Sequence, residues 1–83
     1  MSAASGPTID NVMTVVRLQL GLREVAPDSH LTEDLGAASV DIVNIVATLE
    51  DNFAIEIDDA DLDRLATVRD LCDIARAKWR TLR

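Results

Sequence analysis

A run of three small residues before a long apolar segment constrains the fold of this chain more than any other feature. Gly36, Ala37 and Ala38 allow a sharp turn of the backbone and let a large molecule come close. Ser39 follows, and its hydroxyl makes it a good N-cap for a helix from about Ser39 to Asn52, with an acidic residue in the first turn where the helix dipole favours negative charge. We therefore expect an accessible serine hydroxyl at the start of a helix.

Other segments are also predicted to be helical. Thr8 is a suitable cap for a first helix that runs to about Leu20. The acidic segment after residue 58 favours a short helix that starts at residue 59 or 60 and ends at Leu65. Residues 67–70 form a near capping box at the start of a last helix from about Val68 to Arg80.

A long loop, from Leu22 to Ala38, separates the first two helices, and it contains Pro27, Gly36 and several turn-forming polar residues. A loop of this length in a compact domain is unusual and tends to be functional. We expect it to bring Ser39 to the surface from a fixed base.

Size and composition indicate one small helical domain. The chain has 83 residues, of which 2% are aromatic, so aliphatic side chains must form the core. This composition suits a helical bundle better than a β-sandwich. The expected fold is all-α: a small antiparallel four-helix bundle with a long first loop and a short third helix, spanning residues 8–83 after a disordered segment at residues 1–7.

The helix after Ser39 has two apolar strips. The strip expected to face the core consists of Ile42, Val46, Leu49 and Phe53. The second strip consists of Val40, Val43 and Ala47, with the acidic residues Asp41, Glu50 and Asp51 at its edges. An exposed strip of this kind often marks a protein contact, whereas four packed helices can also bury both strips. The sequence leaves these two alternatives open.

The chain has a net charge of -7, and its acidic residues are concentrated in the middle. From Glu24 to Asp63 there are twelve acidic residues and no lysine or arginine. Such a region repels phosphate backbones, which argues against nucleic-acid binding, and it attracts basic surfaces of partner proteins. The alternative is a solvated acidic surface that only keeps the protein soluble.

The sequence gives no support for a membrane protein, a metal-binding protein or an enzyme. No apolar run approaches the roughly 18 residues that span a bilayer, and no signal peptide is recognisable, so we expect a cytoplasmic protein without membrane insertion.

Asp59, Asp61 and Asp63 have the spacing of the first ligands in a calcium loop. Arg64 stands where such a loop requires glycine, so we predict no metal site, although an acidic calcium-responsive module stays open. No side-chain arrangement supports catalysis, which indicates a protein that is not an enzyme.

The residues around Ser39 show a resemblance to a known family. The attachment motif of acyl carrier proteins is similar to Glu33-Asp34-Leu35-Gly36-Ala37 followed by Ser39, one apolar residue and Asp41. Further similarity lies in residues 9–22, 25–31, 49–59 and 67–71. The resemblance implies that Ser39 carries 4′-phosphopantetheine, donated by coenzyme A, whose thiol holds an acyl or aminoacyl group as a thioester.

The resemblance also implies partners. A phosphopantetheinyl transferase would modify Ser39, and acyl- or aminoacyl-loading enzymes and downstream synthases or transferases with basic docking surfaces would bind the carrier, which we expect to be a monomer. Their expected contacts, the docking face, are Val40, Asp41, Val43, Ala47, Glu50 and Asp51. The family's core opens to shelter a fatty chain, and the corresponding residues here include Phe53, Ile57, Leu62, Leu65, Val68 and Leu71.

The motif departs from the family's usual pattern beside the serine. The family usually reads Asp-Ser-Leu where this chain has Ala38-Ser39-Val40. Because Ala38 stands where the family usually has aspartate, this chain lacks a carboxylate that the family's transferases generally contact. Asn44 stands where the family commonly has glutamate. The alternative function is therefore an unmodified acidic carrier-like adaptor. Among carriers, a standalone chain favours a dissociated system for fatty-acid, polyketide, nonribosomal-peptide or amino-acid transfer.

Overall fold

The computed structural model describes residues 6–81, and over this range the chain forms four helices. They are α1 (Ile9–Leu20), α2 (Ser39–Phe53), α3 (Asp59–Leu62) and α4 (Val68–Thr81). The predicted all-α class is confirmed, and the bounds of the three long helices agree with the sequence to within one residue. Within the described range, no helix has both the length and the apolar character needed to cross a membrane.

The third helix is shorter than predicted, because it ends at Leu62 rather than Leu65. The amide of Arg64 donates to the carbonyl of Asp61 at 3.1 Å, and the amide of Leu65 donates to the carbonyl of Leu62 at 3.1 Å. These bonds span three residues instead of four, so the chain tightens into turns after one helical turn.

The caps at both ends of α1 and at the start of α4 are formed by residues that the sequence predicts. Thr8 Oγ1 accepts the Asn11 N–H at 3.1 Å, and Asn11 Oδ1 accepts the Thr8 N–H at 3.2 Å. Gly21 ends α1 at a φ of 66°, in the left-handed region. At α4, Thr67 Oγ1 accepts the Asp70 N–H at 3.1 Å, and Asp70 Oδ2 accepts the Thr67 N–H at 3.0 Å. The backbone bond from Thr67 is the first cause of a lowered pKa at Asp70.

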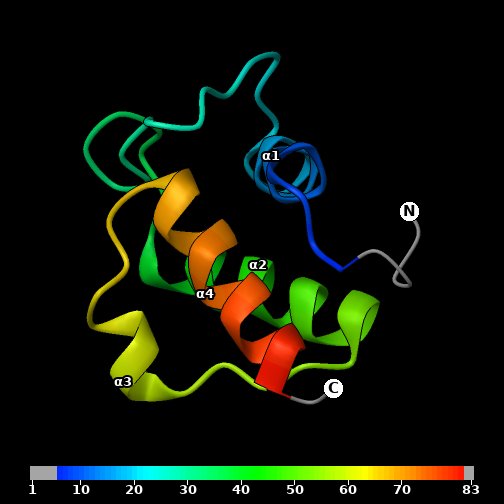
Figure 1. Ribbon diagram of the computed structural model, residues 1–83. Coiled ribbons are helices and arrows are strands. Elements are labelled where there is room, and N and C mark those ends of the chain that lie inside the picture. The colour runs from blue at the N-terminus through cyan, green and yellow to red at the C-terminus, as the bar shows by residue number, and fades with distance from the viewer. Residues whose placement is uncertain (1–5, 82–83) are drawn as a thin grey trace.

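The long helices are arranged around α1. Figure 1 shows α1 almost end-on above α2 and α4, and α1 packs against both. In this view α2 and α4 run in the same general direction, because the segment 54–67, which contains α3, carries the chain back across the molecule. The core therefore lies where α1 faces the other two long helices.

The core is almost entirely aliphatic. Val46, Leu49 and Phe53 are buried as the apolar pattern of α2 predicts, whereas Ile42 is only half-buried. Ile45, outside the predicted core strip, is 1% exposed, because the packed face of α2 is wider than a single strip. The buried residues from α1 and α4 are Val12, Val15, Val16, Val68, Leu71, Cys72 and Ala75.

Part of the segment predicted to be disordered packs against α4. Gly6 and Pro7 are buried, and the carbonyl oxygen of Pro7 accepts a hydrogen bond from Arg76 Nη1 at 2.8 Å. A Cβ atom added to Gly6 would lie 2.9 Å from the ring of Trp79, so glycine permits this close contact. These two residues belong to the folded part, while residues 1–5 lie outside the described range and the domain boundary at residue 8 stays a prediction.

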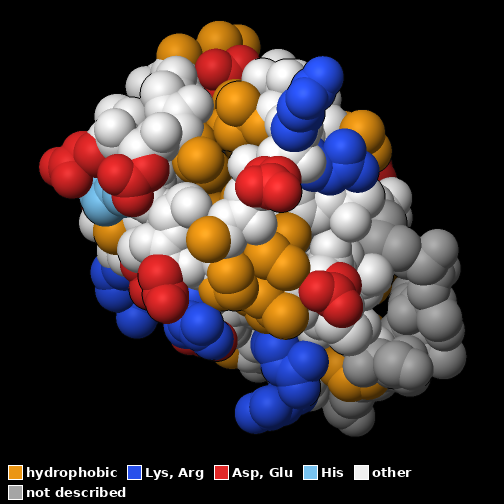
Figure 2. Space-filling model, turned by 90° about the horizontal axis from the view of Figure 1, so that it is seen from above, with side chains coloured by type: hydrophobic (Ala, Val, Ile, Leu, Met, Phe, Trp, Pro, Cys, Tyr) orange, Lys and Arg blue, Asp and Glu red, His pale blue; other side chains and the backbone are white. Residues whose placement is uncertain are grey.

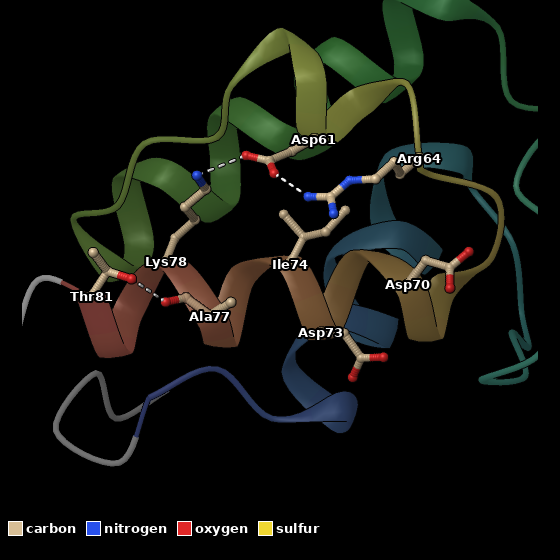
Figure 3. Close-up of a pocket in the computed structure, with 8 residues that line it drawn as sticks. All are labelled: Asp61, Arg64, Asp70, Asp73, Ile74, Ala77, Lys78 and Thr81. Atoms are coloured by element: carbon tan, nitrogen blue, oxygen red, sulfur yellow. Dashed lines mark hydrogen bonds and ion pairs between the residues drawn. The ribbon is translucent and has the colours of Figure 1, made fainter.

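A cluster of charged side chains attaches α3 to α4 (Figure 3). Lys78 on α4 places its Nζ 2.9 Å from Asp61 Oδ2 and 3.2 Å from Asp58 Oδ2. Arg64 Nη2 lies 2.7 Å from the other oxygen of Asp61, and the Asp58 N–H donates to Asp61 Oδ2 at 3.1 Å. Because the carboxylate of Asp61 already has these partners, the structure does not support the calcium-loop alternative.

The cluster shifts two pKa values in opposite directions. The hydrogen bond from Lys78 is the main cause of a lowered pKa at Asp61, and the same bond raises the pKa of Lys78. Asp61 therefore adds stability above its unfolded pKa of about 3.9, and this stability is lost as the pH falls through its lower folded value. Lys78 adds stability below about pH 10.4 and loses it as the pH rises through its higher folded value. The ion pair is intact throughout the neutral range.

Candidate functional site

The long loop before α2 is held against the start of α4. The amide of Leu31 donates to the carbonyl of Ala66 at 2.9 Å, and the amide of Arg69 donates to the carbonyl of Pro27 at 2.8 Å. The Arg69 side chain also pairs with Asp28 at 2.9 Å, and Leu31 is 2% exposed. Figure 2 looks onto the side of α1 and this loop, where hydrophobic side chains lie at the centre with acidic and basic ones around them. The loop thus has the fixed base that the sequence predicts.

A tight turn within the loop leads to α2. Asp34 Oδ2 accepts the His30 N–H at 2.7 Å, and His30 Nδ1 accepts the Glu33 N–H at 3.1 Å. Gly36 has a φ of 69°, which explains the glycine. Ala37 is buried, so its small side chain serves packing rather than access. The sequence did not predict the capping roles of His30 and Asp34, although their spacing around the turn is a usable signal.

Ser39 is the first residue of α2, and Ala38 occupies the N-cap position. The prediction that Ser39 is the N-cap is therefore wrong by one residue. The reason is Asp41, whose Oδ2 accepts the Ala38 N–H at 3.0 Å and so fixes the helix start one residue earlier. Ser39 is exposed, and among the described residues its hydroxyl takes part in no hydrogen bond.

The surroundings of Ser39 suit a covalently attached anion. The first N–H groups of a helix lack intrahelical partners, and the helix dipole favours negative charge there. A Cβ atom added to Gly36 would meet nothing within 4 Å, so the space beside this glycine is open. Ala38 is exposed and small. A phosphate group bonded to Ser39 therefore fits the residues present at this helix end.

The second apolar strip of α2 lies at the surface, which decides between the two alternatives that the sequence left open. Val40 is 63% exposed and Val43 is 57% exposed, and they are among the large hydrophobic residues most exposed in the described range. Ala47 and Asp51 are exposed on the same helix. These residues lie on α2 after Ser39, while Asp41 is half-buried and bonded to the backbone.

Glu50 has a structural contact that the sequence did not predict. Its Oε2 accepts the Ile57 N–H at 2.9 Å, and the residue is only half-buried. This bond ties the segment after α2 back to the helix. Seven positions separate the two residues, so no local spacing rule identifies the pair. Of the three predicted docking-face acids, Asp51 is exposed, whereas Asp41 and Glu50 are half-buried.

Comparisons with known proteins point to one family. A family model described as "Phosphopantetheine attachment site" matches residues 10–75. The acyl carrier protein of Helicobacter hepaticus is 42% identical over 66 residues, which cover 77% of this chain and 87% of that protein. The acyl carrier protein of Nitratidesulfovibrio vulgaris is 35% identical over 71 residues, covering 83% of this chain and 93% of that protein.

Solved structures show the same fold. An acyl carrier protein from Thermotoga maritima superposes with a TM-score of 0.76 at 28% identity, covering 90% of this chain and 89% of that chain. A holo acyl carrier protein from Geobacter metallireducens superposes with a TM-score of 0.77 at 22% identity, covering 90% of each chain. At that identity the second match supports the fold alone.

Proposed function

The chain belongs to the acyl carrier protein family, and from this premise we propose that Ser39 is the residue to which 4′-phosphopantetheine is attached. Acyl carrier proteins are carriers rather than enzymes, and phosphopantetheine is their prosthetic group. The observation that carries the proposal is an exposed serine hydroxyl without a hydrogen-bond partner among the described residues, at the first position of a helix of 15 residues.

The prosthetic group and the chain have separate tasks. Phosphopantetheine supplies a flexible arm whose terminal thiol holds an acyl or aminoacyl group as a thioester. Ser39 supplies the oxygen to which the arm is attached, and the amide groups at the start of α2 favour its phosphate. Asp41 keeps the helix start in place through Ala38, so the attachment point is fixed while the arm moves.

We extend the proposal to partners and setting. A phosphopantetheinyl transferase and acyl- or aminoacyl-handling enzymes with basic surfaces are the proposed partners, and Val40, Asp41, Val43, Ala47, Glu50 and Asp51 are their proposed contacts. The curated relatives are matched over 87% and 93% of their own length, which supports a carrier function of the same kind for this domain. The cytoplasmic location and the monomeric state stay predictions.

Incubation with coenzyme A and a broad-specificity transferase tests the function. We expect the native chain to gain the mass of one phosphopantetheine group, and Ala38→Asp to gain it faster, because the new carboxylate stands beside Ser39 where the family usually has one. Ala38→Ser is the matched control: it supplies an N-cap oxygen, which stabilises a helix by about 1 kcal/mol, but no charge. Intact mass against time measures all three rates.

The outcomes separate carrier from adaptor. An acceleration in Ala38→Asp but not in Ala38→Ser would assign the effect to the charge. If neither the native chain nor Ala38→Asp gains mass, the unmodified acidic adaptor becomes the better account, since the serine is exposed in both.

The docking face gives a second prediction. Val43→Asp should lower kcat/KM of the transferase by about tenfold, because an exposed apolar contact is replaced by a charge that must be desolvated. Leu18→Asp on α1 is the matched control, since Leu18 is 66% exposed and lies outside the docking face. Equal losses in both variants, with unchanged thermal unfolding, would show that α2 has no special role in recognition.

A further inference from the structure

α3 is weakly anchored by apolar contacts. It has only four residues, and the apolar side chains in and beside it, Ile57, Leu62 and Leu65, are half-buried. By contrast, Phe53 on α2 and Leu71 on α4 are buried. A four-residue helix is not stable by itself, so polar contacts must contribute much of what holds α3 in place.

Asp61 supplies the main polar contact to another helix. It is the one charged residue that is buried within residues 6–81. A carboxylate removed from water needs charged or hydrogen-bonding partners. Arg64 is one partner, but its side chain is 74% exposed and follows Asp61 by three positions. Lys78 is 28% exposed and comes from α4, so the pair between Lys78 and Asp61 joins two helices (Figure 3).

We propose that the ion pair between Asp61 and Lys78, which we call the α3 clasp, holds α3 closed. In this account α3 opens and closes locally while the rest of the domain stays folded. The strength of the α3 clasp determines how often α3 opens. Opening would expose Leu62 and its half-buried neighbours while α1, α2 and α4 stay packed. The proposal goes beyond the carrier function and does not depend on the role of Ser39.

Amide hydrogen exchange, read residue by residue, tests the clasp. The amides of Leu62 and Asp63, which donate to the carbonyls of Asp58 and Asp59, report on α3, and the amide of Leu49 reports on the core. In the native chain the α3 amides should exchange faster than that of Leu49. In Lys78→Gln they should speed up by about tenfold or more, because the buried carboxylate loses its charged partner on α4 and keeps only the exposed Arg64, while the Leu49 amide changes far less.

Two further variants make the test specific. Arg80→Gln removes the same charge from an exposed position on α4 and should leave α3 exchange unchanged. The double variant Asp61→Asn with Lys78→Gln should open α3 more often than the native chain but less often than Lys78→Gln alone, because no buried charge is stranded. Equal acceleration of α3 and core amides in Lys78→Gln, or equal α3 exchange in the single and double variants, would overturn the proposal.

Discussion

Ser39→Ala should abolish the gain of phosphopantetheine completely and leave the fold intact. The substitution removes the only atom of this residue that can accept the group. It should change the free energy of unfolding by no more than about 0.5 kcal/mol, because Ser39 is exposed, has no hydrogen-bond partner for its hydroxyl among the described residues, and alanine favours helices. Intact mass after incubation with coenzyme A and a broad-specificity transferase measures the first effect, and thermal unfolding measures the second.

Ser29→Ala is the matched control for that experiment. Ser29 lies in the long loop, where its Oγ accepts the Ala26 N–H at 3.2 Å. We expect this variant to gain one phosphopantetheine group as the native chain does. If Ser39→Ala still gains the group, or Ser29→Ala loses it while folded, the assignment of the attachment residue is wrong.

Leu49→Ala should have the largest effect on stability. Leu49 is 0% exposed at the centre of the α2 core face, so the truncation leaves a cavity that its neighbours fill only in part. The expected cost is about 2–5 kcal/mol of unfolding free energy. A domain of this length has roughly 4–12 kcal/mol in total, so much of the variant population should be unfolded at moderate temperature. Urea titration followed by helix content measures the loss.

Leu18→Ala removes the same atoms from the surface. Because Leu18 is 66% exposed on α1, this control should shift the free energy of unfolding by no more than about 0.5 kcal/mol. A loss at Leu49 as small as the loss at Leu18 would mean that the core is not packed as described.

Local sequence signals predicted most of the fold. The boundaries of α1 and α4 followed from Thr8 and Thr67, whose caps involve residues three positions away. Such contacts depend on neighbours in the chain, so their spacing can be recognised in the sequence. The same holds for the core residues Val46 and Leu49, which recur at helical spacing. The family resemblance, confirmed by the comparisons, added the prosthetic group.

Contacts between distant residues were not predictable. The Asp61–Lys78 pair joins two helices across a turn, and nothing in its spacing distinguishes Lys78 from the other basic residues near the C-terminus. The shift of the N-cap from Ser39 to Ala38 had a different cause, because the Asp41 side chain accepts the Ala38 N–H and so places the helix start at Ala38, whose own side chain has no capping oxygen to signal it. Whether Val40 and Val43 were buried depended on the packing of the other helices, which only the structure supplies.

The attachment residue can be located directly by fragmentation mass spectrometry of the modified native chain. Trypsin cuts after lysine and arginine, and none lies between Arg23 and Arg64, so a single peptide contains both Ser29 and Ser39. We expect the added phosphopantetheine to be assigned to Ser39 in every modified molecule. Assignment to Ser29, or to any residue outside this peptide, would contradict the proposal that the start of α2 is the attachment site.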